Sequence, residues 1–406
     1  MENPKIRFKG FTKDWEQRRF GEITELKSAS RVHKDEWTSN GVPFYRSSDV
    51  MTAINGTENE KAFISEELYE KLSKVSGKLE EGDILVTGGG SVGNPYIVPD
   101  NKPLYTKDAD LLWIKNKGKF HPYFLYEFFF SPTFRNYLGS ISHVGTIAHY
   151  TITQLSDTPI GLPIFEEQKE VGEYFQSLDR LITLHQRKCD QTKNLKKYML
   201  QKMFPQNGAK VPEIRFDGYT YDWEQRKLSE LLEKYEDPVE TPHDGYERVG
   251  IRSHAKGTFH SFVEPGKELD TAKMYRVAAD KFILNITFAW EHAVAITDNN
   301  DAGKLVSHRF PQFSFNPKLK PHFFKYLMLD KKFREHLELS SPGGAGRNRV
   351  LKISDMLKYE IKLPSIEEQI KIGEYFDSLD HLITLHQRKC DELKKMKKYM
   401  LQNMFI

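Results

Sequence analysis

The feature that most constrains this chain is a long charged segment that occurs twice. Residues 165–204 return as residues 366–405, so the two copies lie 201 positions apart. Within residues 172–190 the copies differ only where Gln176 and Arg180 become Asp377 and His381. Near-identity over every face of a segment indicates two equivalent surfaces that each fit the same kind of partner. A recent duplication is the alternative explanation.

Each copy predicts one long helix with a coiled-coil seam. Pro364 and Ser365 followed by Glu368 predict a helix start with an N-cap and a capping box. At ~1.5 Å per residue each helix is about 60 Å long and forms a rod. Apolar or weakly polar residues alternate in steps of four and three, which predicts a seam at Tyr174, Leu178, Leu181, His185, Thr192, Leu195 and Met199, and in the second copy at Tyr375, Leu379, Leu382, His386, Leu393, Met396 and Met400.

A shorter repeat, or box, precedes each globular region. PKIRFKGFTKDWEQRRFGEI from Pro4 returns as PEIRFDGYTYDWEQRKLSEL from Pro212, and we expect Trp15 and Trp223 to anchor its packing. The second box follows the end of the first helix. A second helix that buries its seam against the first must therefore run antiparallel and end near the first box. This predicts a pseudo-twofold circular repeat, with two globular domains separated by a pair of long antiparallel helices.

The globular regions differ from each other far more than the helices do. Short runs rich in apolar residues predict strands, and later segments of each region have helical spacing, so both regions are expected to be α+β. We place the first domain at 1–161, the first helix at 162–206, the second domain at 207–362 and the second helix at 363–406. The expected strands are 42–50, 83–87, 110–114, 246–253, 281–290 and 292–297, and the expected helices are 123–137 and 322–337.

Composition limits the class of protein. A chain of 406 residues with 38% hydrophobic content is long enough for two folded domains. The net charge is only +3, so a nucleic-acid surface must arise from local clustering of charge. No apolar run is long enough to span a bilayer, and no signal peptide follows Met1, which predicts a cytoplasmic protein without membrane contact. Cys189 and Cys390 occupy matching helix positions and are expected to be buried thiols, not disulfide partners or metal ligands.

Three segments resemble catalytic motifs, but the residues within or after them do not fit those motifs. Gly88–Gly93 satisfies GxGxxG, but Asn94 and Pro95 follow where a phosphate-binding helix should begin, so a hairpin turn is predicted. Asn94-Pro95-Tyr96 resembles an adenine methyltransferase tetrapeptide that lacks one proline. Pro99-Asp100 is not followed by a nuclease-type acid-x-Lys. With no metal-like His and Cys spacing either, the sequence predicts a chain without catalytic or metal-binding residues.

The whole arrangement resembles the specificity subunits of type I restriction and modification enzymes. The resemblance rests on the boxes IRFxGF…DWEQR at Ile6–Arg18 and IRFDGY…DWEQR at Ile214–Arg226, and on LP…EEQ at 162–168 and 363–369. It implies a non-catalytic subunit whose two target-recognition domains bind a bipartite site in double-stranded DNA. It also implies that the helices dock a pair of modification subunits, which bind S-adenosylmethionine and methylate adenine, and that restriction subunits join through that complex. No cofactor is expected in this chain.

Candidate DNA-binding residues were chosen because Arg, Lys, Asn, Ser and Thr on exposed loops read base edges, whereas phosphates accept basic side chains without selecting sequence. Each candidate is otherwise an ordinary solvated loop residue. In the first domain they are Arg46, Ser47, Ser48, Gly89, Ser91, Thr146 and His149, and in the second Arg248, Arg252, Ser253, His254, Lys256, Arg347, Asn348 and Arg349.

Candidate docking residues for the modification subunits lie at the two helix starts. They are Glu166, Glu167, Gln168, Glu367, Glu368 and Gln369, although acidic residues in a first turn also match the helix dipole. Two other functions remain open from the residues alone. One is an autonomous methyltransferase or nuclease, which needs a cofactor or metal site, and the other is a coiled-coil scaffold without sequence preference on DNA.

Overall fold

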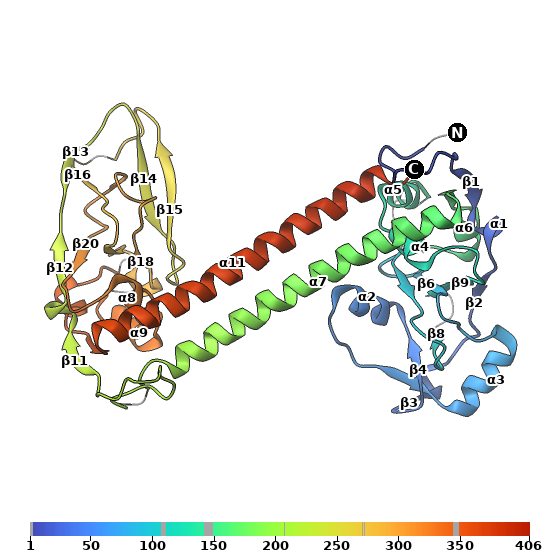
Figure 1. Cartoon of the computed structure of the whole chain (residues 1–406), viewed down its shortest axis with the longest axis horizontal. Helices are drawn as coiled ribbons and strands as arrows, with labels where there is room; N and C mark the ends of the chain where they lie inside the picture. The colour runs from blue at the N-terminus through green and yellow to red at the C-terminus, as the bar shows by residue number, and fades with distance from the viewer. Residues whose placement is uncertain are drawn as a thin grey trace. The chain divides into compact units, whose positions relative to one another are not determined.

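The computed structural model describes residues 3–106, 111–141, 149–206, 208–269, 271, 273–343 and 349–406. The chain forms two compact units: the first joins Met1–Gln186 to Gln387–Ile406, and the second is Arg187–His386. The long helices α7 (Phe165–Lys202) and α11 (Ile366–Asn403) each give one half to each unit (Figure 1). The division into compact units therefore falls in the middle of the two long helices.

The first unit contains two four-stranded sheets, with orders β2-β9-β6-β7 and β3-β5-β4-β8. Strands β6 and β9 are fully buried because one face packs against the helices α4 and α5, whereas the other face packs against Val50 of α2 and against Leu79, Val98 and Leu104. The elements of this unit are β1 (Glu16–Arg19), α1 (Phe20–Ile23), β2 (Leu26–Ser28), η1 (Lys34–Glu36), β3 (Trp37–Thr38), β4 (Val42–Tyr45), α2 (Ser47–Asn55), β5 (Ala62–Ile64), α3 (Glu66–Ser76), β6 (Ile84–Thr87), β7 (Pro95–Ile97), β8 (Tyr105–Thr106), β9 (Leu111–Ile114), α4 (Pro122–Phe128), α5 (Pro132–Ile141), α6 (Ile152–Asp157) and β10 (Pro159–Leu162).

The second unit repeats this plan with sheets ordered β12-β20-β17-β18 and β13-β16-β19-β14-β15. The correspondence is close: β14 runs parallel to β19 as β4 runs parallel to β8, and β17 pairs with β18 as β6 pairs with β7. Its elements are β11 (Glu224–Lys227), η2 (Leu228–Glu230), β12 (Leu232–Tyr235), β13 (Pro238–Glu240), β14 (Tyr246–Ile251), β15 (Thr258–Val263), β16 (Lys273–Arg276), β17 (Phe282–Leu284), η3 (Ala289–Glu291), β18 (Val294–Ile296), β19 (Leu305–Val306), β20 (Gln312–Phe315), α8 (Pro321–Leu327), α9 (Lys331–Leu339), α10 (Ile353–Met356) and β21 (Glu360–Leu363).

The α+β prediction is confirmed, with two local corrections. The strand expected at 42–50 ends at Tyr45, because the Asp49 carboxylate accepts a hydrogen bond from the Arg46 backbone N–H at 2.9 Å and so caps the start of α2. The helix expected at 123–137 is two helices, α4 and α5, and the same break separates α8 from α9.

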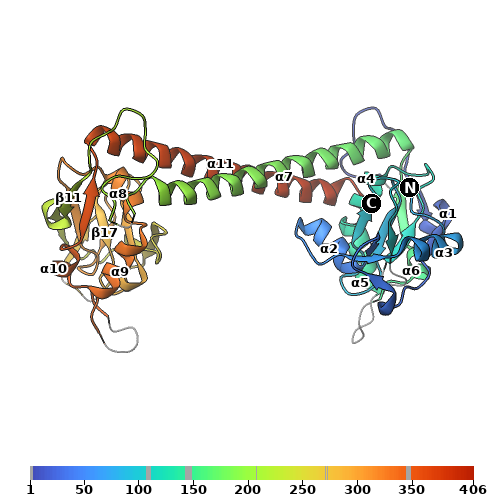
Figure 2. The ribbon, with the colours of Figure 1, turned by 90° about the horizontal axis from the view of Figure 1, so that it is seen from below.

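The two sequence boxes meet the helix entries in short antiparallel strand pairs. β1, which carries the first WEQR motif, pairs with β10 just before α7, and β11 pairs with β21 just before α11. Trp15 and Trp223 are buried, as predicted. In the first unit the backbone N–H of Ile6 donates to the carbonyl of Asn403. The end of α11 therefore packs against the first box, which confirms the circular repeat (Figure 2).

In both units the phenylalanine just after the end of a long helix makes equivalent contacts with aromatic rings of the core. Phe405 lies 5.3 Å from Phe124 and 5.9 Å from Phe175 between ring centroids, in the first unit. In the second unit Phe204 lies 5.6 Å from Phe323 and 6.0 Å from Phe376. Each globular core therefore receives the end of the helix that starts in the other unit.

The helices α7 and α11 pack together antiparallel, but three of the seven seam positions predicted in each copy were wrong. Leu178, His185, Thr192 and Met199 do lie along it. Leu181 and Leu195 are instead 42% and 44% exposed, and Tyr174 packs against Phe8 of the first box. The other seam row is Phe175, Ile182, Cys189, Lys196 and Met203, matched on α11 by Phe376, Ile383, Cys390, Lys397 and Met404.

The lysines of this row are half-buried because they are paired. In the first unit the Lys397 ammonium donates to Asp179 at 2.7 Å and to the buried Glu127 at 2.9 Å. Burial, only partly offset by Lys397, raises the pKa of Glu127 to about 8. In the second unit Lys196 donates to Asp380 at 2.5 Å.

The residue equivalent to Glu127 in the second unit is Tyr326, and its surroundings differ. The Tyr326 hydroxyl donates to Asp377 at 2.6 Å and to Asp380 at 2.8 Å. Lys325 also donates to Asp377, at 2.7 Å. Burial opposes ionisation of Asp377, but the hydrogen bonds from Lys325, Tyr326 and His322 outweigh it and lower its pKa. Asp377 stands at the position of α11 that Gln176 occupies in α7. This difference between the two helix copies is therefore explained by the different domain residues that the two positions contact.

Candidate nucleic-acid interface

Both helix starts carry a buried ion pair in place of an exposed docking patch. Arg7 of the first box binds the fully buried Glu167 through two hydrogen bonds of 2.7 and 2.8 Å. Arg215 of the second box binds Glu368 in the same way, at 2.7 Å twice. Ser365 caps α11 as predicted, but Glu368 is committed to Arg215, so the second half of the capping box is not made through that residue.

The two glutamines are also used within the fold. Gln168 accepts from the backbone N–H of His121 and donates to the carbonyl of Pro163. Gln369 accepts from the N–H of Lys320 and donates to the carbonyls of Lys318 and Pro364. Buried side chains with internal partners offer no surface to a second subunit. Of the six docking candidates, only Glu166 and Glu367 are exposed.

Arg-Ser dipeptides occupy equivalent places in the two units, immediately after β4 and β14. Arg46 is held internally: its guanidinium donates to Asp49 at 2.9 Å and to the carbonyl of Glu60 at 2.6 Å, and it lies 5.5 Å from the Trp37 ring. Ser47 and Ser48 begin α2. A role for Arg46 on DNA stays a prediction, and it requires these bonds to break.

In the second unit the arginines after and within β14 differ in exposure. Arg252 is exposed, donates to the carbonyl of Thr258 and lies over the Phe259 ring. Arg248 sits within the strand, where it pairs with Ser261 and with Leu305 of the next strand. Lys256 is exposed in the turn between β14 and β15.

The Gly88–Asn94 loop joins β6 to β7, which confirms the hairpin prediction. Gly93 has φ of +76°, and a Cβ there would lie 2.9 Å from both Phe134 and Leu138, so the position requires glycine. Arg135 supports the loop by donating hydrogen bonds to the carbonyl of Val92 and to the side-chain oxygen of Asn94. Ser91 is exposed at the tip, whereas Gly89 is buried.

The equivalent hairpin loop of the second unit, 285–293 between β17 and β18, was missed. It contains the 3₁₀ helix η3 and presents Trp290 and Glu291, both partly exposed. The predicted residues Ser253 and His254 converge on it: the Ser253 hydroxyl donates to Glu291 at 2.6 Å, and the His254 N–H donates to the Glu291 carbonyl at 2.9 Å. The strand predicted at 281–290 ends at Leu284, and its aromatic residues Phe288 and Trp290 belong to this loop.

A second segment joins each hairpin loop at an equivalent place. The Tyr150 N–H donates to the carbonyl of Gly88 at 2.7 Å, and the Leu351 N–H donates to the carbonyl of Ile286 at 2.9 Å. His149 is exposed beside the first loop, and Arg349 lies over the Trp290 ring of the second. Thr146, Arg347 and Asn348 lie outside the described residues.

In the second unit three elements meet at one corner. At the corresponding corner of the first unit the hairpin loop meets the segment that enters α6, and the ring of Tyr45, at the end of β4, lies 5.1 Å from the ring of Tyr96 in β7. We call it the reading corner: the end of β4 or β14, the hairpin loop after β6 or β17, and the segment that enters α6 or α10. The scaffold around the corner is repeated, but its lining is glycine-rich in the first unit and aromatic and charged in the second. The two corners therefore share a scaffold and differ in the side chains that they present.

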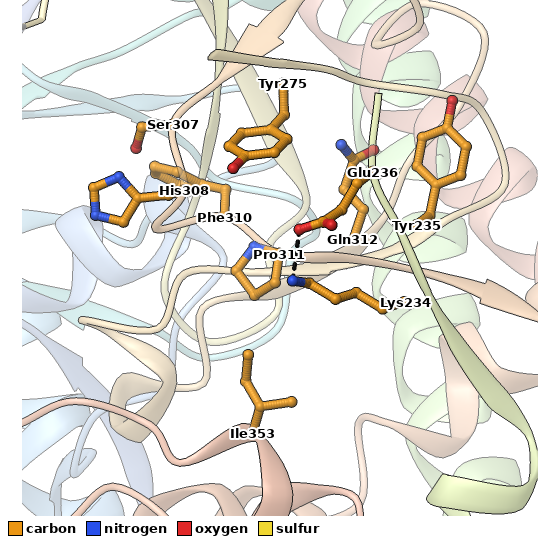
Figure 3. A pocket seen from close by; sticks show the side chains of 10 residues that line it. All are labelled: Lys234, Tyr235, Glu236, Tyr275, Ser307, His308, Phe310, Pro311, Gln312 and Ile353. Carbon is orange, nitrogen blue, oxygen red and sulfur yellow. Dashed lines mark ion pairs between the residues drawn. The ribbon is translucent and has the colours of Figure 1, made fainter. Parts of the chain in front are cut away.

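Pockets elsewhere differ in size, and several reach about 390–590 Å³. The pocket in Figure 3 lies among Lys234, Glu236, Tyr275, His308 and Gln312 and has a volume of about 120 Å³, below the roughly 300–1,000 Å³ of typical cofactor sites. The ion pair drawn there joins Lys234 to Glu236 at 2.5 Å. Across the described part of the chain, no group of three or more His, Cys, Asp and Glu side chains is placed to hold a metal ion. Cys189 and Cys390 are both buried, as predicted.

Comparison with known proteins assigns the family. The model of the type I restriction modification DNA specificity domain matches residues 12–194 and again residues 221–395. The chain belongs to this family of specificity subunits, which recognise DNA within type I restriction-modification systems. Its homologues are non-catalytic, and no helix among the described residues is long and apolar enough to cross a membrane.

Individual relatives cover most of the chain. It is 23% identical to the type I restriction enzyme MjaVIII specificity subunit of Methanocaldococcus jannaschii, over 84% of this chain and 82% of that protein. A putative MjaX specificity subunit of the same organism is 25% identical over 96% of this chain and 92% of its own length. The crystal structure of the type I S subunit from M. genitalium shares the fold with a TM-score of 0.60, at 13% identity over 100% of this chain and 99% of that one.

Proposed function

We propose that this chain binds a bipartite DNA target, one half-site per unit, and directs partner adenine methyltransferase and restriction subunits to it. The observation that carries the proposal is the pair of reading corners. Both units keep the paired sheets, the long helices and the ion pair between box and helix start, but not the hairpin loops, where GGGSVGN in one unit stands against NITFAWEHA in the other. Two equivalent supports with different contact groups suit two different half-site sequences.

The docking of methyltransferase subunits is supported by apolar side chains left exposed on the helices. In the first unit these are Leu181 and Leu184 of α7 and Met396 and Tyr399 of α11; in the second they are Leu195, Tyr198, Leu382 and Leu385. All are 41–56% exposed. Leu181 and Met396 each precede a seam residue by one position, so they flank the seam on the same side of two antiparallel helices. Such a stripe fits an amphipathic helix of a partner.

Each unit carries one copy of this stripe, which suits two methyltransferase subunits per chain. Those subunits, not this chain, would bind S-adenosylmethionine, and restriction subunits would join the assembled complex. Changing Leu181 and Met396 to Glu should abolish co-purification of one methyltransferase subunit. Thr183→Glu is the matched control and should leave assembly intact, because Thr183 is exposed and follows the seam residue Ile182, which puts it on the side of the helix opposite Leu181.

The experiment that tests the function is methylome mapping. The chain is expressed with its cognate methyltransferase subunit in a host without adenine methylation, and methylated adenines are mapped across the genome. One bipartite motif with a fixed spacer is the expected result. A stable complex that methylates no defined motif would favour a scaffold without sequence readout, and methylation by the purified chain alone would show an autonomous enzyme.

A further inference from the structure

Arg349 in the second reading corner is held by an aromatic ring. Its guanidinium carbon lies 5.5 Å from the centre of the Trp290 ring. The ring is itself fixed, because the indole Nε1–H donates to the carbonyl of Thr287 at 3.1 Å. The other contact of Arg349, to Glu338, is long at 3.4 Å, and both side chains are partly open to solvent. A DNA base can therefore replace Glu338 without disturbing the stack.

The hairpin loop that carries Trp290 is also held by the turn that follows β14. Besides the bonds from Ser253 and His254 to Glu291, the Ala255 N–H donates to the carbonyl of His292 at 2.8 Å. His254 and Ala255 both have left-handed backbone, with φ of +63° and +50°, which these bonds stabilise. Arg252 and Lys256 are exposed on the same loop. The corner thus combines one ring-held arginine, a fixed loop and exposed basic side chains.

We propose that Trp290 and Glu291 are specificity-determining positioning residues, and that Trp290 presents the Arg349 guanidinium to a guanine of the second half-site. Arginine binds the O6 and N7 acceptors of guanine through two hydrogen bonds in the major groove. Stacking on an aromatic face sets the plane of the guanidinium, so little side-chain entropy is lost when both bonds form. Glu291 fixes the loop through Ser253 and His254, and Arg252 and Lys256 contact phosphate without selecting sequence.

The hairpin loop of the first reading corner differs from that of the second. Its hairpin loop has glycines at 88, 89, 90 and 93 and offers backbone groups and Ser91, so no aromatic side chain of that loop holds an arginine. Loss of an aromatic platform should therefore alter only the second half-site. This inference rests on the proposed bipartite recognition, and the test separates the two.

The test is methylome mapping of the complex with Trp290→Ala, Trp290→Phe, Arg349→Ala and the double variant. For Trp290→Ala, preference for one G·C pair of the second half-site should fall about 10-fold or more, the effect expected of a weakened bidentate arginine contact. Trp290→Phe, which keeps a ring, should retain most of that preference. The double variant should lose no more than Arg349→Ala alone, because both changes remove the same contact.

The first half-site is the internal control. If it is still read and the second loses one base pair, the variant is folded and the inference holds. If the wild-type chain yields a bipartite motif that Trp290→Ala leaves unchanged, the inference is overturned while the proposed function stands. An equal loss at all sequences would reassign Arg349 to phosphate and would also overturn the inference. A wild-type chain without any motif would refute the proposed function itself.

Discussion

Gly172 and Gly373 occupy equivalent places in α7 and α11, and replacing each with alanine should have different effects. A Cβ at Gly172 would lie 2.4 Å from Nδ1 of His121 and 2.9 Å from the backbone nitrogen of Phe124. A Cβ at Gly373 would lie 3.0 Å from the Cβ of His322 and 3.4 Å from the backbone nitrogen of Phe323. The close contacts at Gly172 require α4 to move. Those at Gly373 require the neighbouring atoms to shift by only a few tenths of an ångström.

The magnitudes follow from two opposing effects. Alanine in place of glycine stabilises a helix interior by about 1 kcal/mol in both variants. Overpacking of a close contact costs about 1–3 kcal/mol, and the shorter distances at Gly172 place it near the upper end. We therefore expect Gly172→Ala to destabilise the first unit by roughly 1–2 kcal/mol and Gly373→Ala to change the second unit by less than about 1 kcal/mol.

Peptide-resolved amide hydrogen exchange measures both effects in the intact chain. Protection of residues 122–128 should fall in Gly172→Ala, with residues 321–327 as the reference in the same sample. In Gly373→Ala both segments should keep their protection within about a factor of five, which corresponds to about 1 kcal/mol. Equal losses in the two variants, or a larger loss in Gly373→Ala, would show that the close approach of α7 to α4 does not set the requirement for glycine.

Further predictions concern the buried charges. Arg7→Ala should destabilise the first unit by about 3–5 kcal/mol, because it leaves Glu167 buried without its partner; denaturant unfolding would measure this, and a loss below 1 kcal/mol would contradict it. Because the folded-state pKa of Glu127 is raised to about 8, its contribution to stability is fully present below pH ~4.5 and is lost as the pH rises towards 8. Protection of α4 relative to Glu127→Gln should thus decline between pH 5 and pH 8, and a constant difference between the two proteins would refute the assignment.

The sequence was most informative where the repeat was most regular. The two long helices, their antiparallel packing and the circular closure followed from two copies with one offset, although α7 and α11 are shorter than the expected 162–206 and 363–406. The seam was only half predicted because each helix carries two apolar rows. Lys196 and Lys397 belong to the buried row although lysine is strongly polar, since Asp380 and Asp179 neutralise them. No hydropathy pattern reveals that compensation, because the acids come from the other helix.

The site was harder to predict than the scaffold. Arg7 and Glu167 recur as Arg215 and Glu368, and such a co-repeated pair of opposite charges was a readable signal for a structural ion pair. Trp290 gave no comparable signal, because its role depends on Arg349, nearly sixty positions away, being brought over its ring. Ser253, His254 and Arg349 were chosen by residue type alone, and the structure supplies the loop that joins them.

The different partners of Glu127 and Tyr326 determine where two such chains can exchange domains. If the domains were exchanged at the helix start, the first domain would be joined to α11. Glu127 would then meet Asp377, Asp380 and a single lysine. A junction within Leu181–Asp190, which is identical to Leu382–Asp391, keeps Gln176 and Asp377 with their own domains. The transferable module of this protein is therefore a domain with half a helix attached. A crossover in that identical stretch would keep the contacts of Glu127 or Tyr326 with that half helix, while the other half helix of the unit would change, for example from Leu393 to Thr192.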